Sequence, residues 1–359
     1  MRKLLTPFKG KSLQLKNHIV MAPMTRSRAI GNIPNALMAQ YYGQRTGAGL
    51  IITEGTAPAP EALGYPRMPG IFSEKQIEGW KLVTENVHKN GSKIFLQLMH
   101  VGRIGHSANL PEGIQLVGAS SIPAAGQIHT DLLDKQDYSI PNALSSEGVK
   151  KVITSFVVAA ENAIAAGFDG VEIHGANGYL IEQFLNPNVN DRTDEYGGSI
   201  ENRIRFALEV VEQVSKAIGQ DKVGIRISPY STLGDLQPYG TIATQQTYVQ
   251  MALQLNHLGI AYIHISINPL MPTATLSAIR SKFKGTMIYS GNFTAETAEE
   301  ELLNGDGNLI AFGRSFLANP DFVERIMAGA PLNSVDFNTV YTPDAKGYTD
   351  YPKMTEVKK

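Results

Sequence analysis

The stretch GVEIHGANGY, residues 170–179, decides the fold of this chain together with the segments on either side of it. Its first four residues form a short apolar run with β-branched side chains, which is typical of a buried strand. Helical patterns precede it at 147–166 and follow it at 200–218, since apolar residues return there every three or four positions. A strand between two helices is the repeating unit of a parallel sheet.

The same alternation extends along the chain. Further helical patterns lie at 74–89, 244–258 and 295–303, and apolar runs that predict strands lie at 18–21, 50–53, 94–98, 170–173, 223–227, 262–265, 286–289 and 309–312. Eight such units predict closure into a (β/α)8 barrel of the TIM type, in the α/β class. An open doubly wound sheet ranks lower, because no strand is followed by the glycine fingerprint of a Rossmann unit.

The longest departure from this rhythm is the segment 101–146, after the third predicted strand, with β-rich pieces at 115–117 and 127–130. In the usual barrel geometry an insertion here lies over the mouth, where it can serve as a lid, and a surface excursion without a role is the open alternative. No low-complexity linker interrupts the chain, so we expect a single domain over residues 1–359.

Composition excludes several classes of function. No apolar run approaches the roughly 20 residues of a membrane-spanning helix, and a net charge of -1 gives no indication of a nucleic-acid or membrane partner. Residues 1–17 lack the apolar core of a secretory signal, so we expect a cytoplasmic location. The chain has no cysteine, which excludes disulfides, thiolate metal sites and thiol nucleophiles. Redox chemistry would therefore need a bound organic cofactor.

An imidazole, a carboxamide and a phenol follow the strand at 170–173, in His174, Asn177 and Tyr179. Two neutral hydrogen-bond donors and a proton donor suit a reaction in which a carbonyl or nitro oxygen gathers negative charge while a nearby carbon takes a proton. Structural roles are the alternative for each residue taken alone, and convergence at one strand end favours the functional interpretation. No His/Asp/Glu set has familiar metal-ligand spacing, and the Gly-x-Ser-x-Gly elbow of serine hydrolases is absent.

Two other strand ends suit a phosphate. Gly291 and Asn292 follow the strand at 286–289, and Gly313 and Arg314 follow the strand at 309–312, before a predicted helix at 320–327. Glycine amides and a guanidinium bind anions, and the loops after strands seven and eight of such barrels commonly hold a phosphate. A structural turn is the alternative for either pair alone.

Gln97 and Arg226 end the third and fifth predicted strands. An amide binds both donors and acceptors of a flat heterocycle, and a cation stabilises its reduced, anionic form. The alternative is that both belong to polar layers or ion pairs of the barrel. Together with a phosphate site, however, a bound flavin mononucleotide is the simpler account.

At this point the chain resembles the Old Yellow Enzyme family of flavin-dependent ene-reductases, in the branch of the bacterial N-ethylmaleimide and pentaerythritol tetranitrate reductases. The matching motifs span nearly the whole chain: APMTR (22–26), GY (64–65) with PGI (69–71), Gln97 with His100 and GR (102–103), the segment 174–203, RISP (226–229), AFGR (311–314) with ANPD (318–321), and GYTDYP (347–352).

The resemblance implies a barrel with noncovalent FMN at its C-terminal mouth. It assigns residues to the lining of the isoalloxazine (Pro23, Met24, Thr25), to ring contacts (Gly55, Gln97), to the N1 and O2 edge (Arg226) and to the ribityl phosphate (Gly291, Asn292, Gly313, Arg314). It places the substrate against His174 and Asn177, with Tyr65, Met99 and Tyr351 beside it.

The implied reaction has two steps. NADPH or NADH reduces FMN and leaves, and an activated alkene (an enone, a maleimide or a nitroalkene) then takes its place. Hydride passes from flavin N5 to the β-carbon, while His174 and Asn177 bind the activating oxygen and Tyr179 protonates the α-carbon. A monomer or a homodimer is expected. A flavin-free barrel lyase or isomerase acting on a phosphorylated substrate is the alternative, and a flavin-binding protein without turnover is a third.

The chain departs from the family pattern at two positions. Many members carry tryptophan where this chain has Met99, and the smaller, flexible thioether predicts a roomier pocket. The close bacterial relatives have a second histidine where this chain has Asn177, which keeps a donor but removes a titratable group. The loop 268–273 is short, and no site contacts are assigned to it.

Overall fold

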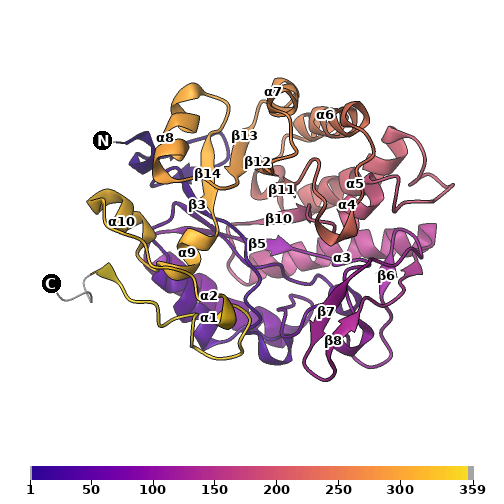
Figure 1. Cartoon of the computed structure of the whole chain (residues 1–359), viewed down its shortest axis with the longest axis horizontal. Coiled ribbons are helices and arrows are strands. Elements are labelled where there is room, and N and C mark those ends of the chain that lie inside the picture. Colours follow the sequence, from indigo (N-terminus) through magenta and orange to yellow (C-terminus); the bar gives the residue numbers. More distant parts are fainter. Residues whose placement is uncertain (1, 355–359) are drawn as a thin grey trace.

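The computed structural model describes residues 2–354, whose central feature is a closed barrel of parallel strands in the order β10-β11-β12-β13-β14-β3-β4-β5 (Figure 1). The strands are β3 (Ile19–Met21), β4 (Leu50–Ile52), β5 (Lys93–Leu98), β10 (Gly170–Gly175), β11 (Val223–Ile227), β12 (Tyr262–Ser266), β13 (Thr286–Ser290) and β14 (Leu309–Phe312). All eight predicted strands are present, and the predicted TIM-barrel fold is confirmed.

Both faces of the barrel strands are buried, which is why they read as continuous apolar runs. Val20 packs inside the barrel with Leu50 and Tyr262, while its neighbours Ile19 and Met21 pack against the surrounding helices. Successive side chains of a strand point to opposite faces, so each strand contributes to both layers.

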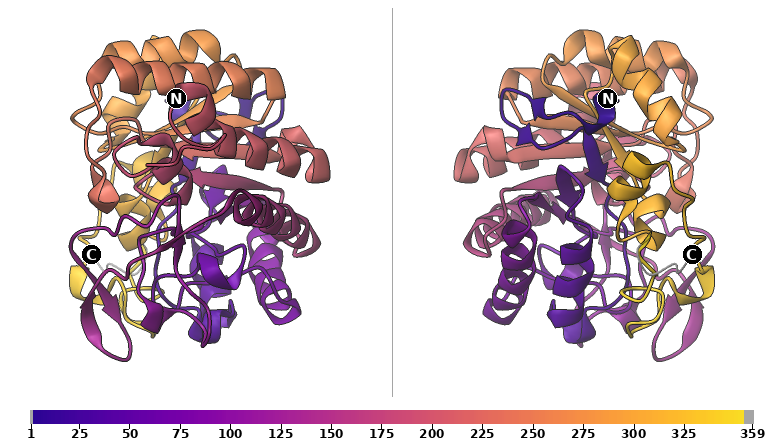
Figure 2. Two further views of the ribbon diagram at one scale, coloured as in Figure 1. Left: turned by 90° about the vertical axis from the view of Figure 1, so that its right-hand side faces the viewer. Right: turned by 90° about the vertical axis from the view of Figure 1, so that its left-hand side faces the viewer.

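Helices surround the barrel (Figures 1 and 2). The principal ones are α1 (Ala36–Gln44), α2 (Glu74–Lys89), α3 (Ser146–Ala165), α5 (Ile200–Ile218), α6 (Thr241–Leu258), α7 (Thr273–Lys282) and α8 (Ala295–Asn304), with shorter α4 (Leu180–Leu185), α9 (Arg314–Ala318) and α10 (Phe322–Ala328). The six predicted helices are confirmed within three residues at each end. Serine and threonine N-caps begin several of them, for example Ser73, whose hydroxyl forms a capping box with Gln76 at the start of α2.

The insertion at 101–146 forms two small sheets. Strand β7 (Gln127–Thr130) pairs with β8 (Asp134–Asp137) as an antiparallel hairpin, and β6 (Val117–Gly118) pairs with β9 (Asn142–Ala143). In both views of Figure 2 the hairpin lies at the same end of the molecule as the C-terminal segment. These two segments therefore share one mouth of the barrel.

A second hairpin, of β1 (Phe8–Lys9) and β2 (Gln14–Leu15), covers the other end of the barrel. Phe8 and Leu15 join the apolar cluster inside the barrel. Gly10 lies beside Thr286, which begins β13, so this hairpin closes the end where the strands start. The active-site cavity opens at the opposite end.

The C-terminal segment is tied to the barrel by two buried arginines. Arg26 donates to the carbonyl oxygen of Gly347 at 2.7 Å, and Arg28 donates to the carbonyl oxygens of Thr339 and Lys346 at 2.8 and 3.0 Å. Both guanidinium groups lie over the ring of Tyr348. These contacts hold residues 337–348 at the mouth.

None of the helices in residues 2–354 is both long and apolar enough to cross a membrane.

Candidate active site

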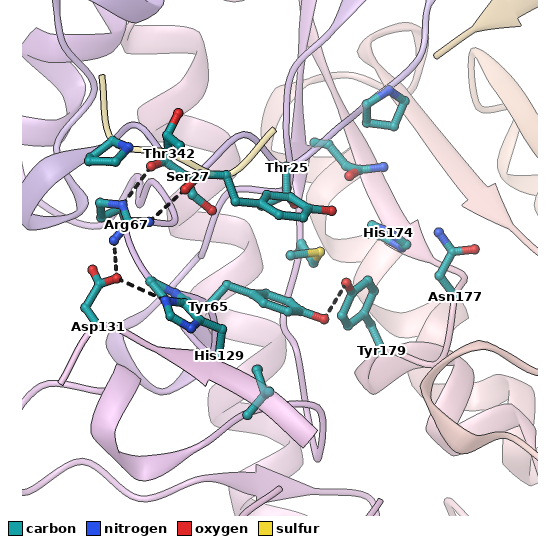
Figure 3. Close-up of a pocket in the computed structure, with 18 of the residues that line it drawn as sticks. Thr25, Ser27, Tyr65, Arg67, His129, Asp131, His174, Asn177, Tyr179 and Thr342 are labelled. Atoms are coloured by element: carbon teal, nitrogen blue, oxygen red, sulfur yellow. Dashed lines mark hydrogen bonds and ion pairs between the residues drawn. The ribbon is translucent and has the colours of Figure 1, made fainter. Parts of the chain in front are cut away.

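A cavity of about 750 Å³ opens at the carboxyl ends of the barrel strands (Figure 3). Its inner wall consists of residues at the ends of β3, β4, β5, β10 and β11: Pro23, Thr25, Gly55, Gln97, Met99, His174, Asn177, Tyr179 and Arg226. The outer wall comes from the loop after β4, the β7–β8 hairpin and the C-terminal segment: Tyr65, Arg67, Ile128, His129, Tyr138, Phe337, Tyr341 and Thr342. The cavity is therefore built from parts of the chain that are far apart in the sequence.

His174 stands at the end of β10 as a neutral donor. The backbone N–H of Ala176 donates to its Nδ1 at 3.2 Å, so the ring proton of the neutral form is on Nε2. Burial lowers the pKa of His174 well below 6.5, and the positive charge of Arg226 lowers it further. The imidazole thus presents an uncharged N–H at neutral pH.

Asn177 follows in a tight turn. Its φ of 58° is left-handed, a conformation that asparagine tolerates better than most residues, and the next residue, Gly178, has a φ of 83°. A Cβ on Gly178 would lie 2.4 Å from the carbonyl oxygen of Leu233, so only glycine fits there. This turn sets the carboxamide of Asn177 in the same cavity wall as His174 (Figure 3).

Tyr179 precedes α4 and is a protonated phenol. Its hydroxyl lies 3.0 Å from the hydroxyl of Tyr65, and its ring makes an edge contact with His174 at a centroid distance of 4.9 Å (Figure 3). Burial raises the pKa of Tyr179 to about 12, although the hydrogen bond with Tyr65 acts in the opposite direction. Tyr179 therefore keeps its proton well above neutral pH.

The two strands that flank β10 contribute polar groups with spare hydrogen-bonding capacity. Gln97 Nε2 donates to Glu172 Oε1 at 2.8 Å, which leaves its amide oxygen free to accept. Arg226 makes a long hydrogen bond of 3.4 Å to Ser266, and its buried Nε has no hydrogen-bond partner among the described residues. A buried guanidinium N–H without an acceptor favours an electron-rich ligand here, as the flavin N1 and O2 edge is.

The predicted phosphate residues lie together at one side of the strand ends, outside the residues that line the cavity. Strands β13 and β14 pair Ser290 with Ala311, which brings the following residues close, and Arg314 donates to Asn292 Oδ1 at 2.8 Å. The sulfur of Met24 lies 3.5 Å from the place a Cβ on Gly313 would occupy. Met24 thus connects the ring-binding end of the predicted site with its phosphate-binding end.

Comparisons with known proteins identify the family. A family model described as "NADH:flavin oxidoreductase / NADH oxidase family" matches residues 3–333. The chain belongs to this family. Among curated relatives, 12-oxophytodienoate reductase 2 of Arabidopsis thaliana is 42% identical over 98% of this chain and 96% of its own length. 12-oxophytodienoate reductase 1 of Oryza sativa subsp. japonica is 43% identical over 99% of this chain and 94% of its own.

Solved structures agree with the Old Yellow Enzyme assignment. A structure of morphinone reductase superimposes with a TM-score of 0.94 at 41% identity, and covers 98% of this chain and 96% of its own. A variant of morphinone reductase in complex with tetrahydroNAD reaches a TM-score of 0.95 at 41% identity, over 99% of this chain and 98% of its own.

Membership confirms the predicted enzyme class. This Old Yellow Enzyme is an FMN-dependent ene-reductase that uses a nicotinamide dinucleotide as reductant and acts on activated alkenes. The flavin-free lyase or isomerase finds no support, since the matching family consists of flavin oxidoreductases. The unpaired Nε of Arg226, the free amide oxygen of Gln97 and the Arg314–Asn292 pair fit the cofactor that the family requires.

The predicted substrate contact Tyr351 is not among the residues that line the cavity. Its hydroxyl accepts a hydrogen bond from the backbone N–H of Asp336 at 3.0 Å. The arginines that hold the C-terminal segment bring Phe337 and Tyr341 to the mouth in its place. The family motif at 347–352 thus lies behind the wall rather than in it.

Met99 lines the cavity, and its thioether packs so closely on Gly55 that a Cβ on Gly55 would lie 2.6 Å from the sulfur. Apart from Tyr65, sequence reasoning missed the outer wall, including Arg67, Tyr138 and Tyr341, because loop residues without periodicity give no indication of where they lie. It also missed Glu182, which stands behind Asn177. An acidic residue on an otherwise fully buried helix was the available indication.

Proposed function

We propose that His174 and Asn177 bind the activating oxygen of the alkene and that Tyr179 protonates its α-carbon. The observation that carries this proposal is the presence of all three groups in one wall of the cavity, beside Gln97 and Arg226, whose strands pair with β10 on either side. When bound, FMN supplies the hydride. Hydride transfer to carbon puts negative charge on the activating oxygen, and the α-carbon must still gain a proton. The three side chains would stabilise that charge and supply that proton.

The two hydrogen-bond donors that bind the substrate oxygen carry no charge. The Nε2–H of His174 and the carboxamide N–H of Asn177 are neutral, so they gain most when the oxygen becomes negative and little from the neutral substrate. Because His174 is buried and held by Ala176, it needs no reorganisation during the reaction. The pair therefore acts as a preformed oxyanion site.

Tyr65 would assist the proton transfer. Its hydroxyl lies 3.0 Å from that of Tyr179 and can donate to the phenolate that remains after protonation. Burial raises the pKa of Tyr65 well above 10, so it keeps its own proton. A hydrogen bond to an ionised partner is about twice as strong as one to a neutral partner.

The cofactor would be held from ring to phosphate by the residues that the resemblance named. Thr25, Gly55, Gln97 and Arg226 would contact the ring, and Gly291, Asn292, Gly313 and Arg314 the phosphate.

We expect Arg314→Ala to weaken FMN binding about tenfold or more, because a charge-assisted hydrogen bond is lost. Fluorescence titration of the apoprotein with FMN measures the affinity, and Arg280→Ala, at the other end of the barrel, is the control. Equal affinity in Arg314→Ala would contradict the phosphate assignment.

The groups of the site also set an expected pH dependence. Tyr179 stays protonated below its raised pKa of about 12, and His174 stays neutral above its lowered pKa. We therefore expect the rate constant of alkene reduction at saturating substrate to be flat from about pH 8 to about pH 10.5. Stopped-flow reoxidation by 2-cyclohexenone tests this, and a fall with a midpoint near pH 9 would show that a less perturbed group delivers the proton.

Substrates in this proposal are α,β-unsaturated carbonyl, maleimide or nitro compounds, and the reductant is NADPH or NADH, bound in the same cavity. The similarity to 12-oxophytodienoate reductases and to a morphinone reductase bound to tetrahydroNAD supports both. A cytoplasmic monomer or homodimer completes the proposal.

The decisive experiment is spectroscopic. The purified protein should be yellow, anaerobic NADPH or NADH should bleach it, and 2-cyclohexenone or N-ethylmaleimide should restore the colour. A colourless protein that FMN does not reconstitute would contradict the cofactor assignment. A yellow protein that no activated alkene reoxidises would contradict the substrate class.

A further inference from the structure

A buried carboxylate lies behind the turn that carries Asn177. Glu182 of α4 is 2% exposed and does not line the active-site cavity. It accepts hydrogen bonds from the Gly178 N–H at 2.8 Å, from the Ser228 hydroxyl at 2.8 and 2.9 Å and from the Tyr248 hydroxyl at 2.7 Å. These donors belong to the turn after β10, the end of β11 and helix α6, so one carboxylate connects three parts of the barrel.

The network reaches Asn177 through Ser228. Because the Ser228 hydroxyl donates its hydrogen to Glu182, its oxygen is left to accept, and it does so from the Asn177 N–H at 2.8 Å. The consecutive N–H groups of Asn177 and Gly178 therefore both end on this network. Both residues have left-handed backbones, so the turn is tight, and its two N–H groups are held by this network.

We propose that Glu182 is a positioning residue: its carboxylate, through Ser228 and the Gly178 N–H, fixes the turn that aims the Asn177 carboxamide at the substrate oxygen. This inference rests on the proposed role of Asn177. Neutralising Glu182 disturbs the turn because a carboxylic acid adds a fourth hydrogen to a network of three donors. One hydrogen is then left without an acceptor, which is costly in a buried site.

Glu182 is also able to change its charge near neutral pH. Burial raises its pKa to about 7, against the hydrogen bonds from Tyr248, Gly178 and Ser228 and the positive charge of Arg226. A separate cavity of about 240 Å³ lies on its other side, lined also by Tyr230, Tyr239 and Leu236, and gives water a route to the carboxyl. Since the ionised form holds the turn, ligand binding should strengthen as the pH rises through about 7.

The test measures binding rather than turnover. Nicotinamide, which carries a carboxamide oxygen and does not change charge in this range, is titrated into the oxidised holoenzyme between about pH 6 and about pH 8.5, and the flavin absorbance is followed. Wild-type affinity should rise about five- to tenfold over this range. Glu182→Gln should bind weakly throughout, with a flat profile. The matched control is Glu209→Gln, since Glu209 also accepts from a tyrosine, Tyr196, at 2.9 Å but lies outside the site; it should behave as wild type.

Ser228→Ala provides a second, independent measurement, because it removes the bridge to Asn177 and leaves Glu182 in place. It should weaken nicotinamide binding several-fold, and it keeps the inference testable if Glu182→Gln does not fold. In an Asn177→Ala background, Glu182→Gln should cause no further loss, a coupling that a merely structural residue would not produce.

Wild-type affinity and pH dependence in Glu182→Gln, or additive losses in the double variant, would overturn the inference. Failure of the proposed function has a different signature: the wild-type holoenzyme itself would not bind nicotinamide, or Asn177→Ala alone would bind it normally.

Discussion

Replacing Tyr179 with phenylalanine is expected to slow alkene reduction about a thousandfold, because general-acid catalysis by a positioned group is worth about 10² to 10⁴ in rate. Reduction of the flavin by NADPH or NADH should stay nearly unchanged, since that step needs no proton from the protein. Tyr179 is a buried phenol whose pKa is raised to about 12. Its hydroxyl lies 3.0 Å from the hydroxyl of Tyr65, and its ring makes an edge contact with His174. Anaerobic stopped-flow measurement of the two half-reactions separates these effects.

The matched control for this variant is Tyr196→Phe. Tyr196 is also buried and hydrogen-bonded, to Glu209 at 2.9 Å, but it is not among the residues that line the cavity. It should leave both half-reactions at wild-type rates. If Tyr179→Phe also kept both rates, another group would have to be the proton donor, with Tyr65 the first candidate.

Replacing His174 with alanine is expected to reduce alkene turnover about a hundredfold, the usual effect of removing one donor from an oxyanion site. Nicotinamide and enone binding should weaken as well, because in the proposed site the Nε2–H donates to the oxygen of either ligand. His174→Asn should recover part of the loss, since it restores a neutral donor. Ligand titrations of the oxidised holoenzyme and stopped-flow reoxidation measure the two effects.

His88→Ala is the control for His174, because His88 pairs with Asp169 on the exposed end of α2. It should leave ligand affinity unchanged. Unchanged affinity in His174→Ala would instead show that Asn177 alone binds the oxygen.

Much of the fold could be predicted from local patterns of apolar residues in the sequence. Each barrel strand buries both faces, so its apolar run is continuous, and each flanking helix buries one stripe, so its apolar residues recur every three or four positions. Helices α1 and α7 were not predicted. They are short, and contacts with a neighbouring helix support each of them, α2 for α1 and α6 for α7.

The residues of the inner cavity wall could also be predicted from the sequence. In a closed parallel barrel the carboxyl ends of all strands meet at one mouth, so residues such as Gln97, His174 and Arg226 converge whatever the loops do. The outer wall obeys no such rule. Tyr341 rather than Tyr351 reaches the mouth because Arg26 and Arg28 hold the C-terminal segment more than 300 residues away in the chain.

The sequence by itself determined the barrel, its strands to within two residues at each end and the identity of the groups at the strand ends, because hydrophobic periodicity and strand direction are local properties. Only the tertiary structure decided which neighbours act on those groups. Glu182 meets Ser228 and Tyr248 across separations of 46 and 66 residues. Such contacts depend on how helices pack around the closed barrel, so they cannot be predicted from the hydrophobic periodicity of the sequence. The aim of the Asn177 carboxamide, which we trace to Glu182, is therefore a property of the folded chain alone.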